Sequence, residues 1–224
     1  IGTLSGSAGS ALYSGSDVGG RIATYQVGSR NESSVFAGRI IDSTGATALT
    51  KVGTGTLTLS GTNNTYTGAT AVNVGTLAVD GAIASSVSVA TGAKLAGSGT
   101  VGGLVTLSSG NAAISLTNGV VKTLTLAGGL TLNDGNKLTF DVGASADAIA
   151  MTGGVFTRSG TVTVVVNALP GFAGRTFNLI TGLGISDASG FALTGAPAEW
   201  KVRLVACDGN LQLKNTGGTF ISIL

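Results

Sequence analysis

The amino-acid sequence predicts an all-β protein built as a β-solenoid, in which short strands stack coil upon coil. Short runs that alternate aliphatic side chains with Thr, Ser or Asn recur along the chain, and turn-forming residues stand between them. The 224 residues also include 38 Gly but only 5% aromatic residues. This composition suits a stack of thin coils with glycine at the corners better than a core filled by large rings.

The alternating runs are predicted strands, because alternation with period two places the aliphatic side chains on one face. Turn formers such as Asp80-Gly81, Asn118-Gly119 and Asp208-Gly209 separate them. Apolar spacing indicates no long helix, although residues 145–151 could supply one helical turn. In chain order the predicted strands are residues 56–59, 72–74, 76–79, 87–89, 105–107, 124–126, 130–132, 138–140, 161–166, 177–179, 202–204 and 211–213.

Periodicity alone allows a sandwich, a barrel or a solenoid. Composition favours the solenoid, because a sandwich core of this size normally carries more large aromatic side chains. A reused unit points the same way. Gly-Thr-Leu or Gly-x-Leu openings recur at Gly2, Gly55, Gly75, Gly102 and Gly128.

Charge and composition argue against several classes of protein. Twelve basic and ten acidic residues leave a net charge of +2 without a basic cluster, so no nucleic-acid partner is expected. No apolar run reaches the roughly 18 residues of a membrane-spanning helix. Without His and with one Cys, the chain is expected to hold no metal or cofactor. Cys207 is expected to be a half-buried small hydrophobe rather than a nucleophile.

The acidic residues predict no catalytic site, because hydrolysis of polysaccharides needs two or three carboxylates close together. The ten Asp and Glu residues lie far apart in the sequence. Coil stacking could bring Asp134, Asp141 and Asp147 together. We expect them instead to be turn residues and strand-edge charges. The sequence therefore predicts a protein that is not an enzyme.

One segment carries a specific family resemblance. Between Lys51 and Leu77 the motifs Gly-x-Gly-Thr-Leu, Asn-x-Tyr-x-Gly and Val-x-x-Gly-Thr-Leu follow one another, and an additional Asn stands in the Asn63-Asn64 pair. This segment closely resembles the autotransporter-associated β-strand repeat, the passenger-associated repeat of bacterial autotransporters. The resemblance implies a right-handed parallel β-helix exported from the cell, and a scaffold element without catalytic residues.

Two regions are expected in the chain. Residues 1–166 form the β-solenoid, with the passenger-associated repeat at residues 51–79. Residues 167–224 form a C-terminal β region that either continues the solenoid or caps it, and that ends in an assembly strand. The expected location is secreted or on the cell surface.

The predicted function is that of an extracellular building block of a bacterial surface fibre or passenger stalk, joined head to tail through its ends. An opening strand pattern and a closing apolar strand are the expected assembly elements, with the residues Ile1, Leu4, Phe220, Ile221, Ile223 and Leu224. An open head-to-tail contact of this kind produces a filament.

Two alternatives remain open. An adhesin would bind glycans or host surfaces through loops such as residues 182–198, and a polysaccharide-degrading enzyme would need clustered carboxylates. Four aromatic residues, Tyr13, Tyr25, Tyr66 and Trp200, are candidate sugar-stacking platforms. The single Trp is more often a core or cap residue in such a chain.

Overall fold

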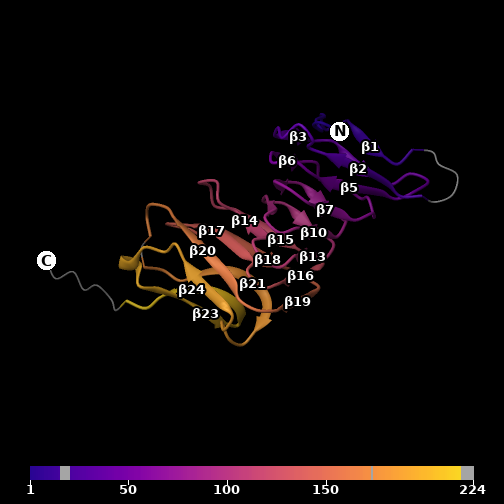
Figure 1. Cartoon of the computed structure of the whole chain (residues 1–224). Coiled ribbons are helices and arrows are strands. Elements are labelled where there is room, and N and C mark those ends of the chain that lie inside the picture. The colour runs from indigo at the N-terminus through magenta and orange to yellow at the C-terminus, as the bar shows by residue number, and fades with distance from the viewer. Residues whose placement is uncertain (16–20, 173, 218–224) are drawn as a thin grey trace.

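The computed structural model describes residues 1–15, 21–172 and 174–217, which form an elongated stack of strands (Figure 1). Apart from strands, these residues contain one 3-10 turn, η1 (Ala198–Trp200). The strands are β1 (Ala11–Tyr13), β2 (Ala23–Val27), β3 (Ser34–Phe36), β4 (Arg39–Ile41), β5 (Thr47–Lys51), β6 (Thr56–Leu59), β7 (Thr70–Val72), β8 (Thr76–Val79), β9 (Ala82–Ile83), β10 (Val87–Val89), β11 (Lys94–Ala96), β12 (Thr100–Val101), β13 (Val105–Leu107), β14 (Ala113–Ser115), β15 (Thr123–Leu126), β16 (Gly129–Leu132), β17 (Lys137–Val142), β18 (Ala148–Met151), β19 (Val155–Arg158), β20 (Val162–Ala168), β21 (Phe177–Ile185), β22 (Phe191–Thr194), β23 (Val202–Cys207) and β24 (Gly209–Asn215).

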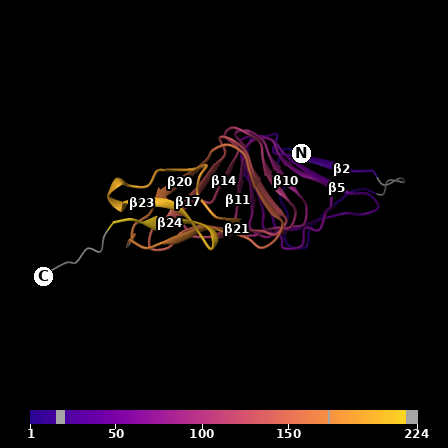
Figure 2. The ribbon, with the colours of Figure 1, turned by 90° about the horizontal axis from the view of Figure 1, so that it is seen from below.

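Three long sheets run along the stack, and each coil contributes strands to them in turn (Figures 1 and 2). Sheet A has the order β22-β20-β17-β14-β11-β8-β6-β3, sheet B the order β19-β16-β13-β10-β7-β5-β2, and sheet C the order β23-β24-β21-β18-β15-β12-β9. From β7 to β18, each strand pairs in parallel with the strand three positions later. The chain is therefore a parallel β-helix, and the predicted solenoid is confirmed.

Inward-facing aliphatic side chains stack on their equivalents in the next coil, which explains the alternating sequence. One ladder in sheet A includes Leu57, Leu77, Leu95, Ile114, Leu138 and Val164, each at most 1% exposed. Burying one such side chain contributes about 1.5–3 kcal/mol. A shift of one residue would turn the polar side chains of a strand inward and interrupt the ladder. The alternation therefore fixes which face of every strand points inward.

Glycine forms a second kind of ladder, at the corner that follows sheet A. Gly38, Gly61, Gly81 and Gly99 lie one above the other, and a Cβ on any of the last three would overlap the carbonyl oxygen of the glycine before it. The backbones of successive coils approach so closely here that no other residue fits. This packing accounts for part of the high glycine content.

The N-terminal end of the stack is formed by residues 1–15, which lie along the first complete coil. Gly6 forms a parallel bridge with Phe36, and β1 pairs in parallel with β4. Sheets A and B end at β3 and β2 on this side. This end is therefore an edge of parallel strands.

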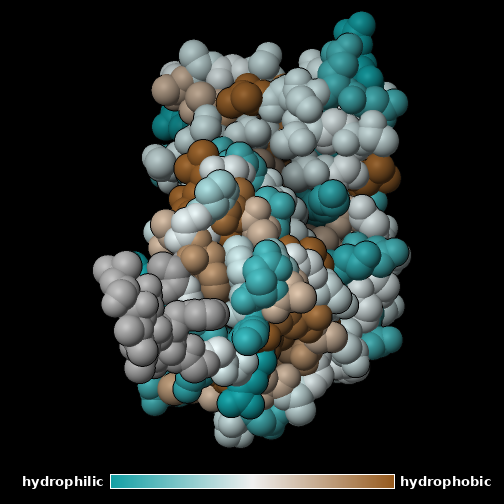
Figure 3. All heavy atoms as spheres, turned by 90° about the vertical axis from the view of Figure 1, so that its left-hand side faces the viewer, coloured by the Kyte–Doolittle hydropathy of each residue, from teal (hydrophilic) through white to brown (hydrophobic). Residues whose placement is uncertain are grey.

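The C-terminal end is different, because sheet C changes from parallel to antiparallel pairing. Strand β21 pairs in parallel with β18 on one side and antiparallel with β24 on the other, and β24 forms a hairpin with β23. Aromatic rings gather here: Phe172 stacks on Trp200 with centroids 4.0 Å apart, and Phe177 lies 6.1 Å from Phe172. Figure 3 looks onto this end and, outside the grey atoms, shows separate hydrophobic patches among hydrophilic residues.

Two local expectations were wrong. Residues 145–151 do not form a helical turn, because Ile149 and Met151 stack on Leu124 and Leu126 as strand β18. Residues 182–198 are not a loop, since β21 extends to Ile185 and β22 continues sheet A. Within the described parts of the chain, no helix is long and apolar enough to cross a membrane.

Candidate functional site

The predicted assembly residues at the N-terminus lie at the edge of the stack. The Ile1 ammonium donates to the carbonyl oxygen of Gln26 at 2.7 Å, and the Ile1 carbonyl accepts from the amide of Gly28 at 3.0 Å. Ile1 is 52% exposed, whereas Leu4 is 9% exposed and belongs to the core. Of these two residues, only Ile1 therefore exposes its side chain at this end of the stack. The other predicted residues, Phe220, Ile221, Ile223 and Leu224, lie outside the described residues.

Of the three acidic residues Asp134, Asp141 and Asp147, the last two lie together in the structure. Asp141, at the end of β17, and Asp147, before β18, are both fully buried, and the backbone amide of Asp141 donates to Asp147 Oδ2 at 2.7 Å. Asp134 lies elsewhere, where its Oδ1 accepts from the amide of Thr161 at 2.8 Å. The expectation of turn or edge charges is right for Asp134 and wrong for the buried pair.

The paired carboxylates hold the loop between β14 and β15 from beneath. Asp141 Oδ2 accepts from the amides of Asn118 at 2.9 Å and Gly119 at 2.7 Å, and Asp147 Oδ1 accepts from the amide of Lys122 at 2.8 Å. Burial raises the pKa of the Asp147 carboxyl, and two backbone amides partly offset that rise. Because every oxygen of the pair accepts from an N–H donor, its evident role is structural.

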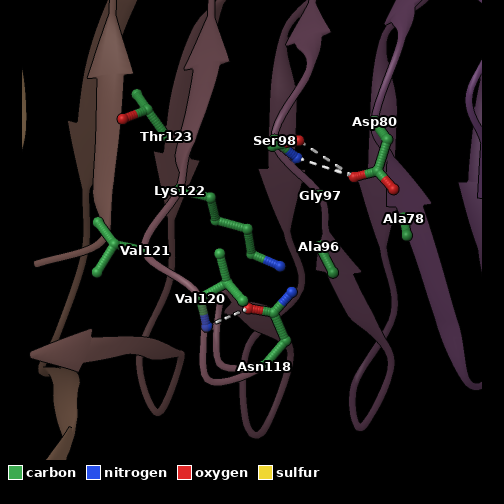
Figure 4. Close-up of a pocket in the computed structure, with 10 residues that line it drawn as sticks. All are labelled: Ala78, Asp80, Ala96, Gly97, Ser98, Asn118, Val120, Val121, Lys122 and Thr123. Atoms are coloured by element: carbon green, nitrogen blue, oxygen red, sulfur yellow. Dashed lines mark hydrogen bonds between the residues drawn. The ribbon is translucent and has the colours of Figure 1, made fainter. Parts of the chain in front are cut away.

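Above this pair, the loop forms one wall of a groove, which we call the loop groove (Figure 4). It encloses about 530 Å³ along the corner that follows sheet A. Its lining residues are Ala78, Asp80, Ala96, Gly97, Ser98, Asn118, Val120, Val121, Lys122 and Thr123. Val120 and Val121 are 65% and 41% exposed on the loop. The sequence offered no signal for this groove beyond the Asn118-Gly119 turn.

The motif residues of the predicted repeat are structural in this fold. Asn64 is 2% exposed and bridges three coils: its Oδ1 accepts from the amide of Ile40 at 2.8 Å, and its Nδ2 donates to the carbonyls of Gly61 at 2.7 Å and Ala82 at 2.8 Å. Asn63 is exposed. The second Asn of the pair therefore forms the corner, and the additional residue points outward.

Tyr66 of the same motif is completely buried, so it is not a sugar-stacking platform. Its hydroxyl group shares a hydrogen bond with Thr70 Oγ1, which in turn shares one with Ser85 Oγ at 2.6 Å. Burial raises the pKa of the Tyr66 phenol. This chain of hydroxyl groups ties the repeat to the following coil.

A buried cation that the sequence did not indicate lies at the end of β5. Lys51 is 1% exposed and occupies an inward position between Val27 and Val72. Its Nζ donates to the carbonyl oxygens of Val52 at 2.7 Å, Gly53 at 2.8 Å and Val74 at 3.2 Å. Burial lowers the pKa of the Lys51 ammonium. The Lys51 ammonium thus provides the hydrogen-bond donor for three backbone carbonyl groups at the corner that follows sheet B.

Trp200, Tyr25 and Cys207, which were considered as candidates from the sequence, have structural surroundings rather than those of a reactive or binding site. Trp200 packs against the core at the C-terminal end, as a cap residue would, and the Tyr25 hydroxyl donates to the carbonyl of Tyr13 at 2.7 Å. Cys207 is exposed rather than half-buried, because the β23–β24 turn places it outside the core. Its hydrogen bond to Asp208 raises the pKa of the thiol, which makes it a poorer nucleophile.

Comparison with known proteins supports the repeat. Residues 49–79 match the family described as passenger-associated-transport-repeat. An extracellular serine protease of Serratia marcescens is 49% identical to this chain over 72 residues, which are 32% of this chain and 7% of that protein. The chain thus spans a small part of the length of this relative. The predicted resemblance to the autotransporter passenger repeat is confirmed, and so is the predicted location, secreted or at the cell surface.

Proposed function

We propose that this chain, which carries a passenger-associated-transport repeat, is a non-catalytic β-helical building block of a bacterial surface fibre or passenger stalk. In this role the chain provides length and stiffness, and its ends provide the contacts to its neighbours. The observation that carries the proposal is the strand edge that residues 1–15, paired along β2, β3 and β4, form at this end of the described residues. A parallel edge presents backbone groups with which a further strand can pair.

The C-terminal region is the proposed complement of that edge. Residues 1–166 would act as the solenoid and residues 167–224 as its cap and assembly segment. The apolar, uncharged sequence of Phe220, Ile221, Ile223 and Leu224 suits addition as a strand to the sheet edge at Ile1. In a longer passenger, covalently linked coils would occupy the same edge.

The proposal assigns no catalytic residue to the chain. No group of three His, Cys, Asp or Glu side chains is placed to hold a metal ion in the parts that the structure describes. The carboxylates of Asp141 and Asp147 are buried and engaged by N–H donors. The name of the Serratia relative describes a protein of which this chain matches 7%, so it carries no activity over to this chain.

The test is negative-stain electron microscopy of the purified chain, together with a variant that lacks residues 220–224. We expect filaments from the intact chain and single particles from the deletion. Leu104→Lys is the matched control, because it removes an exposed apolar side chain (42% exposed) from the middle of the stack and should leave filaments intact. Filaments that persist after the deletion would refute strand donation. An intact chain that remains monomeric would refute the role as a fibre protomer, and the segment of a passenger stalk would remain as the proposed role.

A further inference from the structure

The loop groove contains two hydrogen-bond donors for which the described part of the chain supplies no acceptor. Lys122 is half-buried, and Figure 4 shows its ammonium directed into the groove, toward the side that Asn118 lines. Asn118 uses its Oδ1 to accept from the amide of Val120 at 3.1 Å, which leaves its Nδ2 as a donor. Among the described residues, neither Lys122 Nζ nor Asn118 Nδ2 has an acceptor. Two converging donors, one of them charged, form a seat for a carboxylate or another anion.

The opposite wall offers acceptors instead. Asp80 Oδ1 accepts from the amide of Ser98 at 3.1 Å and from its hydroxyl group at 3.4 Å, so Oδ2 remains available. Between the walls, Ala78, Ala96 and Gly97 are too small to fill the space. A simple anion would be attracted by Lys122 but repelled by Asp80. A ligand that presents both a carboxylate and hydroxyl groups satisfies both walls.

The donor wall is fixed before any ligand arrives. Asp141 holds the amides of Asn118 and Gly119, and Asp147 holds the amide of Lys122. These three contacts anchor both ends of the loop to the core. Binding therefore requires little ordering of the backbone, which favours affinity in a shallow site.

We propose that the loop groove binds an acidic saccharide, with a uronic acid carboxylate on Lys122 and Asn118 and sugar hydroxyl groups on Asp80 and Ser98. The exposed Val120 and Val121 offer an apolar surface to the carbon–hydrogen face of a pyranose ring. The volume of about 530 Å³ accommodates more than one sugar ring. This site lies on the side of the stack, so it is independent of assembly through the ends.

The test is isothermal titration calorimetry of the intact chain with short oligosaccharides of galacturonic, glucuronic and mannuronic acid. Their methyl esters serve as neutral counterparts. We expect saturable one-site binding of at least one acid, weakened roughly tenfold or more by esterification and by Lys122→Met, because each removes a charge-assisted hydrogen bond. Lys214→Met, on β24 in the C-terminal hairpin, is the matched control and should bind as the unaltered chain does.

Several results would overturn the proposal. One is the absence of saturable binding of any of the acids, and another is equal binding of acids and esters. A third is unchanged affinity in a Lys122→Met variant whose circular dichroism matches that of the unaltered chain. Inorganic phosphate or a glutamate-containing dipeptide that binds the same site as tightly would show an anion or zwitterion site, and would equally reject the saccharide assignment.

Discussion

Replacing Asn64 by Ala removes the side chain that joins the passenger-associated repeat to the coil before it, at Ile40, and to the coil after it, at Ala82. The variant loses three hydrogen bonds, of 2.8, 2.7 and 2.8 Å, and leaves the buried amide of Ile40 and the carbonyls of Gly61 and Ala82 without that partner. Each hydrogen bond contributes about 1 kcal/mol net, and a buried group left unpaired costs about 1–3 kcal/mol. We therefore expect the free energy of unfolding to fall by about 3 kcal/mol or more.

The measurement is urea denaturation followed by far-ultraviolet circular dichroism, with Asn63→Ala as the matched control. Asn63 is the same residue type one position earlier, but it is exposed, so its replacement should change the free energy of unfolding by no more than about 0.5 kcal/mol. Equal losses in the two variants would refute the assignment of the corner to Asn64. So would a loss below about 1 kcal/mol for Asn64→Ala.

Three further predictions concern the glycine ladder and the two buried groups Tyr66 and Asp147. Gly81→Ala forces a Cβ into the carbonyl oxygen of Gly61 and should lower the free energy of unfolding by about 3 kcal/mol or more. Gly9→Ala is the control and should be nearly neutral, because nothing lies within 4 Å of the added Cβ. Similar urea midpoints for the two variants would contradict the glycine ladder. Because the pKa of the buried Tyr66 phenol is raised, the phenol loses its proton at a lower pH in the unfolded chain than in the folded chain. The free energy of unfolding should therefore fall as pH rises above 10.0. A Tyr66→Phe variant that loses stability equally steeply would contradict this prediction. Because the pKa of Asp147 is raised, the folded chain binds the carboxyl proton more tightly than the unfolded chain does. Lowering the pH toward 3.8 should therefore stabilise the unaltered chain relative to Asp147→Asn, as measured by parallel urea titrations. The absence of a pH-dependent difference between the two proteins would count against the burial of this carboxyl.

Much of the fold could be predicted because alternation is a local signal. The ladder from Leu57 to Val164 consists of residues whose neighbours already alternate in the sequence. None of the strand ranges predicted from alternation falls before residue 56, however, so β1 to β5 were missed, and so were β9, β11, β12, β14, β18, β19 and β22. Strand β5 shows why: its inward position at Lys51 is charged, and it is tolerated only because three carbonyls accept from the ammonium. A sequence pattern does not reveal such partners.

The candidate site was less predictable, because it depends on how corners fold. Asp141 and Asp147 meet because the chain turns back between them, with an antiparallel bridge from Val142 to Ala146. The position of the loop above them follows from that contact. Neither the turn nor the resulting groove at Lys122 has a signature in residue type or spacing.

The stacking register itself can be measured directly by pulsed electron–electron double resonance. Outward residues of sheet B form one column, in which Gln26, Thr50, Ala71, Ser88, Thr106, Thr131 and Thr157 are paired in turn. Spin labels are attached to cysteines introduced into a Cys207→Ser background, because Cys207 is exposed. With about 4.8 Å between neighbouring strands, the label pairs 26/106, 26/131 and 26/157 should lie roughly 19, 24 and 29 Å apart. Distances that fail to lengthen by about one strand spacing per step would contradict the parallel β-helix.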